Sequence, residues 1–177
     1  MQTATMGAAN DATAQAYVAG VQSAHALEKQ ATQLINRQLG RLQNYPEVAA
    51  VLQQHLAETK DQIDRLDGLL TQLGSSPSSV EDMATMLTGN LAALGHTVMP
   101  DEVIKNHFAN CAFEAFEIAT YRSLIAMAEA TGNGAHVPVY EQSLQEEQST
   151  EQKLQGMTAA LSQKCLELTA AGEKADR

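Results

Sequence analysis

Apolar side chains recur every three or four positions over four long stretches of the chain, and polar side chains fill the positions between them. This spacing is typical of amphipathic helices. It predicts long helices over residues 11–43, 46–73, 101–131 and 138–170. Val and Thr are scattered and never alternate over the length of a strand, so the pattern predicts no β-sheet and an all-α fold.

Proline and glycine fall in four groups that separate these stretches. Pro46 suits the first turn of the second helix, and Gly74 suits the position just after its end. Ser78 and Glu81 have the spacing of a capping box, which predicts a shorter helix over 79–94. These groups are therefore the start and stop signals of the helices.

The lengths of the connections predict the topology. The first and second helices are joined by a tight turn, as are the last two, so each pair forms an antiparallel hairpin. Residues 74–100 are long enough to travel the length of the bundle between the two hairpins. Two hairpins with one long crossover predict a ferritin-like four-helix bundle. We expect one domain over 11–170, with a flexible N-terminus at 1–10 and a flexible C-terminal tail at 171–177.

Composition narrows the classes of partner. The 177 residues carry a net charge of −10, which disfavours nucleic acid as a general partner. No apolar run is long enough for a membrane span, and the first residues lack the features of a signal peptide, so we expect a cytoplasmic protein. Aromatic residues make up only 4% and Trp is absent, which suits close helix packing. Two cysteines do not make a disulfide framework.

Carboxylates interrupt the apolar stripes near the middle of all four long helices. They are Glu28 on the first helix, Glu58 at the stripe's edge on the second, Glu114 and Glu117 on the third, and Glu147 and Glu151 on the fourth. Buried carboxylates repel one another and need either a bound cation or protons shared with Tyr, His and Gln. Antiparallel helices bring their midpoints to one level, so a metal pair bridged by Glu is the favoured solution.

Simpler interpretations stay open for several of these residues. Glu58 lies in a polar run, where a solvated position is at least as plausible as a metal ligand. His55 lies on the inward stripe of the second helix, where hydrogen-bonded packing and metal ligation are equally consistent with the pattern. His25 lies beside the stripe of the first helix, and we expect it at the surface or in an interface.

Four segments resemble the YciE/YciF group of ferritin-like bacterial proteins. The third and fourth helices carry the most specific of them, and the match runs from about residue 14 to 160. The segments are Leu27-Glu28-Lys29-Gln30, His55-Leu56-Ala57-Glu58-Thr59, Phe113-Glu114-Ala115-Phe116-Glu117-Ile118-Ala119-Thr120-Tyr121 and 144–154.

The resemblance implies a ferritin-like bundle, a homodimer, a role in bacterial stress responses and a two-metal site of iron or manganese. Its acidic positions match Glu28, Glu58, Glu114, Glu117, Glu147 and Glu151. We expect Glu28, Glu58, Glu114 and Glu147 as core ligands. Glu117, Glu151 and His55 would be further ligands or would orient the ligands, and Tyr121 would hydrogen-bond a carboxylate.

The chain departs from the family pattern in ways that bear on chemistry. Ala115 stands where the pattern has His, and no helix contains Glu-x-x-His, the pair found twice in typical di-iron bundles. A site this rich in oxygen suits tuned iron redox cycling less well. Simple metal binding is therefore favoured over a ferroxidase or peroxidase. The alternative is a non-catalytic helical scaffold whose core carboxylates are a relic.

Overall fold

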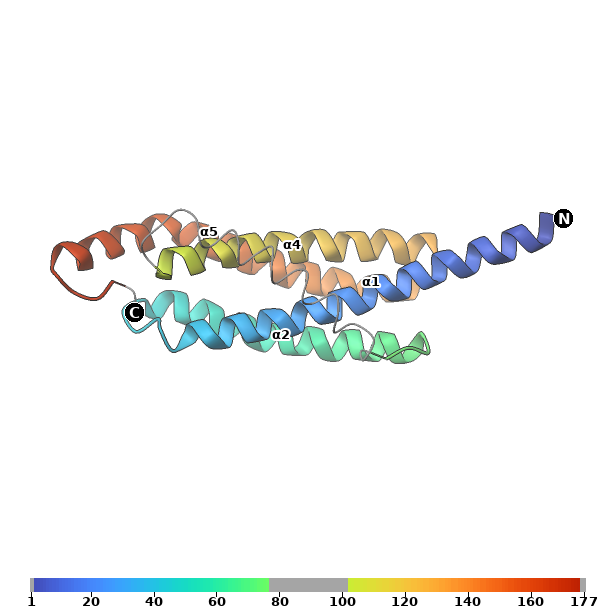
Figure 1. Cartoon of the computed structure of the whole chain (residues 1–177), viewed down its shortest axis with the longest axis horizontal. Coiled ribbons are helices and arrows are strands. Elements are labelled where there is room, and N and C mark those ends of the chain that lie inside the picture. Colours follow the sequence, from blue (N-terminus) through green and yellow to red (C-terminus); the bar gives the residue numbers. More distant parts are fainter. Residues whose placement is uncertain (1, 77–101, 176–177) are drawn as a thin grey trace.

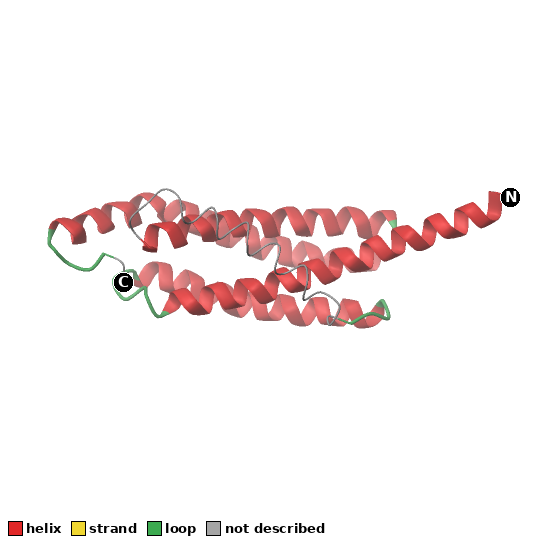
Figure 2. Cartoon of the chain, in the orientation of Figure 1, coloured by secondary structure: helices red, strands yellow, loops and turns green. Residues whose placement is uncertain are grey.

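A computed structural model describes residues 2–76 and 102–175, with side chains from residue 11 onward. The predicted short helix over 79–94 lies outside these residues. The described part of the chain is helical and contains no strand (Figure 2), which confirms the all-α prediction. It has a ferritin-like arrangement of four long helices.

The four long helices follow the predicted order. They are α1 (Gln2–Leu39), α2 (Pro46–Gln72), α4 (Glu102–Ala130) and α5 (Val137–Ala170), with a 3₁₀ turn, η2, at Gly134–His136. Helices α1 and α2 pack as one hairpin and α4 and α5 as the other. Between the hairpins, α1 packs on α4 and α2 on α5.

The direction of the helices confirms the long crossover. Helix α2 ends at the same end of the bundle as α4 ends, and α4 begins at the opposite end (Figure 1). The end of α2 and the start of α4 therefore lie at opposite ends of the bundle, and α2 and α4 run parallel. This is the arrangement that the length of residues 74–100 predicted.

Helix boundaries follow local chemistry closely, except at the N-terminus. Pro46 opens α2, and Gly74, with a φ of +68°, closes it. Helix α1 begins at Gln2, nine residues before its predicted start, and extends past the other helices (Figure 1). Whether residues 1–10 are flexible stays a prediction.

The C-terminal end returns to the first hairpin. The Asn44 side-chain amide donates to the Lys174 carbonyl at 2.9 Å, and the Tyr45 hydroxyl donates to the Ala175 carbonyl at 2.7 Å. Residues 174 and 175, expected in a flexible tail, thus have partners at the α1–α2 turn.

Two large apolar clusters fill the two halves of the bundle. One is built on Tyr17, Leu66, Leu70, Leu124 and Tyr140. The other is built on Ile35, Leu52, Val103, Leu154 and Leu161. The mid-helix polar residues lie between these clusters, so the packing that stabilises the bundle also fixes the walls of a polar centre.

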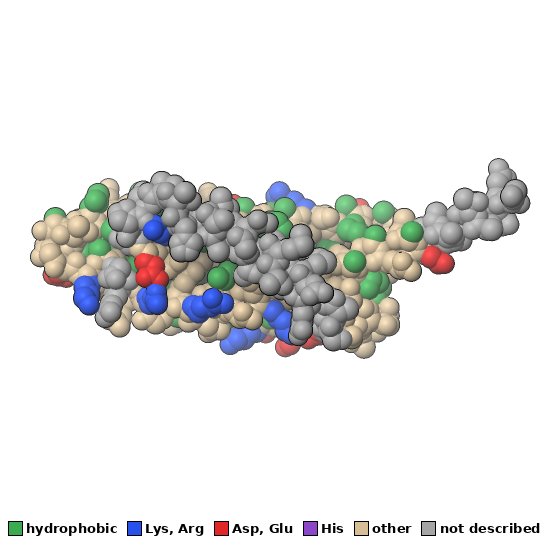
Figure 3. Space-filling model, in the orientation of Figure 1, with side chains coloured by type: hydrophobic (Ala, Val, Ile, Leu, Met, Phe, Trp, Pro, Cys, Tyr) green, Lys and Arg blue, Asp and Glu red, His purple; other side chains and the backbone are tan. Residues whose placement is uncertain are grey.

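The chain has a net charge of −10, but its positive side chains are not spread evenly over the surface. On the face in Figure 3, Lys and Arg side chains gather along α1 and α2. Within the described residues, none of the helices combines the length and apolarity that crossing a membrane requires.

Candidate metal centre

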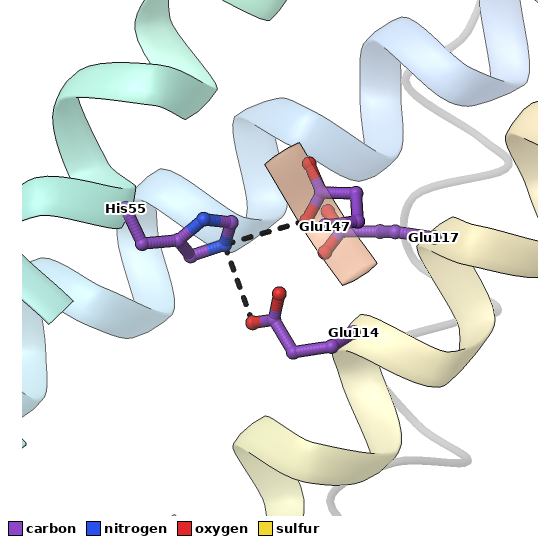
Figure 4. A group of neighbouring side chains, drawn as sticks. All are labelled: His55, Glu114, Glu117 and Glu147. Atoms are coloured by element: carbon purple, nitrogen blue, oxygen red, sulfur yellow. Dashed lines mark ion pairs between the residues drawn. The ribbon is translucent and has the colours of Figure 1, made fainter. Parts of the chain in front are cut away.

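Four side chains from three helices point at one another in the middle of the bundle (Figure 4). They are His55 on α2, Glu114 and Glu117 on α4, and Glu147 on α5. Glu114 and Glu117 are three residues apart, which places both on one face of the helix. All four side chains are buried, with at most 2% of their surface exposed.

The distances between these groups suit a shared cation. Each can offer one ligand atom such that all the atoms lie within 4.8 Å of one another. His55 Nε2 lies 3.2 Å from Glu114 Oε1 and 3.7 Å from Glu147 Oε2 (dashed lines in Figure 4). A cation placed among them would be within reach of one imidazole nitrogen and several carboxylate oxygens.

Glu28 on α1 adds a fourth carboxyl group to the cluster. It is 1% exposed, and its Oε1 accepts a hydrogen bond from the Tyr121 hydroxyl at 2.6 Å. The charge of Glu28 contributes to raising the pKa of Glu117, and that of Glu114 to raising the pKa of Glu147, so Glu28 belongs to the same cluster as the other three carboxyl groups. The predicted contact of Tyr121 with a carboxylate is therefore present, and all four long helices supply an acidic or imidazole group.

Burial dominates the electrostatics of the cluster. Loss of solvent raises the pKa of Glu28 to about 7, against the opposing effect of the Tyr121 hydrogen bond. Loss of solvent, and then the charges of neighbouring glutamates, raises the pKa of Glu117 and Glu147 well above the usual range. At neutral pH the metal-free centre therefore holds protons that a cation would displace.

The pKa of His55 is also raised, but by its neighbours and against the effect of burial. Burial alone would lower its pKa, but hydrogen bonding to Glu114 and the charges of Glu114, Glu28 and Glu58 raise the pKa above its ordinary value. The carboxyl groups around the imidazole therefore favour its charged form. In that form the imidazole occupies the electrostatic role that a metal ion would take.

The donor set of the cluster fits bound metal. Neither oxygen of Glu117 receives a hydrogen bond from a described donor. The same is true of one oxygen each of Glu28, Glu114 and Glu147. Buried acceptors without donors are unfavourable and are commonly satisfied by an ion. Four carboxylates would also balance the charge of two divalent cations.

Two predicted ligands lie outside this cluster. Glu58 has 26% of its side chain exposed, with Oε2 4.0 Å from His55 Nδ1, on the opposite side of the ring from Glu114. Glu151 is half-buried and accepts a hydrogen bond from Gln155. A direct metal role for either would need the side chain to move, and it stays a prediction.

The structure corrects the placement of His25. Its side chain is 2% exposed, whereas we expected it at the surface or in an interface. His25 Nε2 lies 3.0 Å from Asp67 Oδ1 on α2, so a partly exposed carboxylate reaches inward to satisfy it. An ion pair between helices cannot be inferred from the phase of one helix.

Several polar neighbours of the cluster were not singled out from the sequence. Gln62 donates to Glu147 and Glu146, and Arg65 pairs with Glu146 and donates to Ser143. Gln62 does lie on the predicted inward stripe of α2. Ser143 and Glu147 are four residues apart on α5, so helical spacing could have placed Ser143 on the same face as Glu147. No spacing within one helix could have predicted the ion pair of Arg65 with Glu146.

Comparisons with known proteins agree with this fold. Residues 12–167 match the family model described as Domain of unknown function (DUF892). A Xanthomonas campestris protein of known crystal structure is 28% identical, with a TM-score of 0.75 over 89% of this chain and 99% of that one.

Two further solved structures share the fold at lower identity. The Escherichia coli stress protein YciF is 22% identical, with a TM-score of 0.70, and covers 83% of this chain and 94% of its own. The bacterioferritin of Desulfovibrio desulfuricans, whose structure contains a diiron site, is 15% identical, with a TM-score of 0.69, 87% of this chain covered and 84% of that one. These likenesses show a ferritin-like fold.

Proposed function

We propose that this chain, which belongs to the DUF892 family that includes the YciE/YciF group, is a ferritin-like stress-response protein that binds a metal pair. The observation that carries the proposal is the buried cluster of His55, Glu114, Glu117 and Glu147, together with Glu28. The diiron site of the bacterioferritin with the same fold supports it. The stress role is supported by the likeness to YciF, which is described as a stress protein.

The side chains divide naturally between two ions. Glu114, Glu147 and His55 would hold one ion, Glu28 would hold the other, and Glu117 lies within reach of both groups. Tyr121 and Gln62 would orient Glu28 and Glu147 by the hydrogen bonds they donate. One imidazole among four carboxylates favours Mn²⁺ or Fe²⁺ over softer ions.

Binding is proposed ahead of catalysis. A bound iron or manganese pair would supply redox chemistry with oxygen or peroxide. The chain has one histidine in the cluster and lacks Glu-x-x-His, so its ligand set is harder than that of a typical ferroxidase. The protein residues would hold the ions, exclude water and accept or release the carboxyl protons.

A non-catalytic scaffold is the second candidate function, and a specific observation favours it. Neutral donors already serve two of the carboxyl groups, because Tyr121 donates to Glu28 and Gln62 donates to Glu147. With their raised pKa values, the glutamates could remain protonated in a bundle that never binds metal. The cluster would then be a relic that tolerates burial.

Metal content and chelation separate the two functions. The full chain is purified without a metal-affinity tag, analysed for metals, and melted before and after chelation. We expect about two Fe or Mn ions per chain and a lower melting temperature after chelation, because a ligand that binds only the folded state stabilises it. A metal-free chain whose melting temperature ignores both chelator and added Fe²⁺ would instead establish the scaffold.

The variant Glu147→Gln gives an independent measurement. Its amide removes a buried acid that loss of solvent makes costly to ionise, so the metal-free variant should melt at a higher temperature than the native chain. The same change should weaken metal binding. Glu141→Gln, an exposed change on the same helix, is the matched control and should alter neither property.

We also propose a cytoplasmic homodimer. Helix α4 offers an outward face for it, because Phe108 and Phe116, two turns apart, are each 43% exposed. The exposed residues between and beside them are Ala112, Ala115 and Ala119. A charge-free face of this kind suits contact with a second copy.

A further inference from the structure

A line of polar side chains connects the buried cluster with the surface between α2 and α5. At its outer end Arg65 and Glu146 form an ion pair, with 19% and 20% of their side chains exposed. Gln62 Nε2 donates both to Glu146 Oε2, at 3.0 Å, and to Glu147 Oε1. A single amide therefore links a carboxylate that water reaches with one that is fully buried.

A second set of contacts runs beside the first. Arg65 Nη2 donates to Ser143 Oγ at 3.1 Å, and Ser143 is a near neighbour of the Tyr121 hydroxyl. Tyr121 in turn donates to Glu28. The polar line from Arg65 thus reaches both sides of the cluster, through Glu147 and through Glu28.

Apolar side chains flank this line of polar side chains. On one side it is bounded by the apolar cluster that contains Leu66, Leu69 and Tyr140. On the other side lies the cluster that contains Leu52 and Leu154. An ion moving through either cluster would lose its water without gaining a ligand, whereas the polar line offers oxygens at each step.

One atom on the line lacks a partner in the described structure. Gln62 is 0% exposed, and its Oε1 accepts no hydrogen bond from a described donor. A buried acceptor without a donor is unfavourable. If the amide turns over, the same oxygen points between Glu146 and Glu147, where it repels two carboxylates unless a cation lies between them.

We propose that Glu146, Gln62 and Arg65 form the port through which a divalent cation enters and leaves the buried cluster. Without a cation, the Arg65 guanidinium neutralises Glu146 and closes the port. An arriving cation displaces Arg65 from Glu146, takes the Gln62 amide oxygen as its next ligand, and passes to Glu147. Glu146, Gln62 and Glu147 each offer the cation an oxygen, the ligand atom that hard cations prefer.

This proposal rests on the proposed metal binding, and kinetics can test it apart from affinity. The full chain is mixed with Co²⁺ in a stopped-flow instrument, and the visible absorbance of bound Co²⁺ gives the association and dissociation rate constants. Equilibrium titration of the same samples gives stoichiometry and affinity. A port residue changes both rate constants in the same direction, because it acts on the barrier and leaves the bound state unchanged.

The variants have opposite expected effects. Glu146→Gln removes the first carboxylate, which lowers the barrier that an ion crosses in both directions. Both rate constants should fall on the order of tenfold, within the range by which charged entry points change association rates. Arg65→Met removes the competing cation and should raise both. Glu141→Gln, on the exposed side of the same helix, removes the same charge and should leave both rate constants within about twofold of native.

Three outcomes would overturn the proposal. Rates in Glu146→Gln that match those in Glu141→Gln would show that ions enter elsewhere. A loss of affinity in Glu146→Gln through faster dissociation alone would make Glu146 a ligand rather than a port. A native chain that binds no Co²⁺, Mn²⁺ or Fe²⁺ at equilibrium would refute the proposed function itself, and the port with it.

Discussion

Tyr121 and Gln62 are neutral side chains that donate hydrogen bonds to the buried carboxyl groups. Tyr121 donates to Glu28 at 2.6 Å, and Gln62 donates to Glu147. Both donors are at most 1% exposed, so water does not replace them easily when they are removed. Each therefore offsets part of the cost of burying an acid in the core.

Replacing Tyr121 by Phe should measure one of these contributions. The variant keeps the aromatic ring and loses the hydroxyl, so Glu28 Oε1 loses its donor. We expect the free energy of unfolding of the metal-free chain to fall by about 1–2 kcal/mol, as for other hydrogen bonds to ionisable groups. Chemical denaturation measures it.

Tyr140→Phe is the matched control. Tyr140 is equally buried, but its hydroxyl pairs with another phenol, that of Tyr17, at 2.8 Å. Tyr17 also keeps its contact with His136 Nδ1 at 2.8 Å. Tyr140→Phe should therefore cost less than Tyr121→Phe, and a larger cost would show that Glu28 gains little from its phenol donor.

Helical phase predicted the cluster residues better than it predicted their neighbours. Glu28, Glu117, Glu147 and His55 lie on predicted inward stripes and are buried. The stripe positions Thr120 and Glu151 are half-buried, whereas the adjacent Tyr121 and Thr150 are buried. Steps of three or four residues miss a full turn by about 60° or 40°, so a stripe written in such steps can select a position at its edge instead of the adjacent position at its centre.

Helix ends depend on a few residues with special backbone behaviour. Gly74, at a φ of +68°, follows the last turn of α2, where its N–H donates to the Thr71 carbonyl at 3.1 Å and the Ser75 N–H donates to the Leu70 carbonyl at 2.9 Å. Gly68 lies inside the same helix with no such requirement. In both places a methyl group would meet nothing within 4 Å.

The two glycines therefore give a paired prediction. Gly74→Ala should destabilise the chain by about 1 kcal/mol, because an L-residue is strained at positive φ. Gly68→Ala should stabilise it by roughly 0.5–1 kcal/mol, because alanine favours a helix interior. Thermal or chemical unfolding measures both. Equal effects of one sign would contradict the assignment of Gly74 to the helix-ending position.

The same chemistry explains which helix ends were predictable. Pro46 and Gly74 mark the limits of α2, and the predicted bounds of 46–73 differ from the observed helix by one residue. Residues 2–10 contain one glycine and no proline, so the sequence carried no strong signal to stop α1 from beginning early. Gly40 follows the last residue of α1, whereas the predicted first helix extends to residue 43.

Contacts between helices were the least predictable part of the structure. The connection lengths predicted the order and direction of the helices. The pairs of Arg65 with Glu146 and of His25 with Asp67 each require both the rotation and the axial level of two helices. One helix's periodicity supplies neither the level nor the partner, and such pairs can be recognised only after the bundle is assembled.

The assembly of two copies through α4 makes a direct prediction. If Phe116 lies in the homodimer interface, Phe116→Glu buries an unpaired charge there, so the dimer should dissociate into monomers. Light scattering after size-exclusion chromatography measures the mass. Leu166→Glu, at a side chain 69% exposed on α5, is the control and should remain dimeric. A dimer that survives Phe116→Glu would place the interface elsewhere.

The whole bundle should respond to pH through its buried acids. The pKa of Glu28 is raised to about 7, and those of Glu117 and Glu147 are raised well above their usual range, mainly by burial. The folded metal-free chain therefore binds more protons than the unfolded chain, and its stability falls as pH rises. His25, His107 and His136 have lowered pKa values and act in the opposite direction near pH 6.5.

Between pH 7 and 8.5 these three histidines are mostly neutral in both states, so the acids dominate. We expect the melting temperature of the metal-free chain to fall across this interval. Each extra proton held by the folded state contributes about 1.4 kcal/mol per pH unit. With excess Mn²⁺ the trend should reverse, because metal binding needs the deprotonated carboxylates and strengthens as protons leave.

Glu147→Gln tests whether the buried acids, rather than the general negative charge of the surface, make the melting temperature depend on pH. The variant lacks one of the three titrating acids, so its metal-free melting temperature should depend less steeply on pH than that of the native chain. Glu141→Gln also replaces one Glu of α5 by Gln, makes the net charge less negative by one at an exposed position, and should keep the native slope. If both variants flatten the slope equally, repulsion across the acidic surface is the cause and the buried cluster is not.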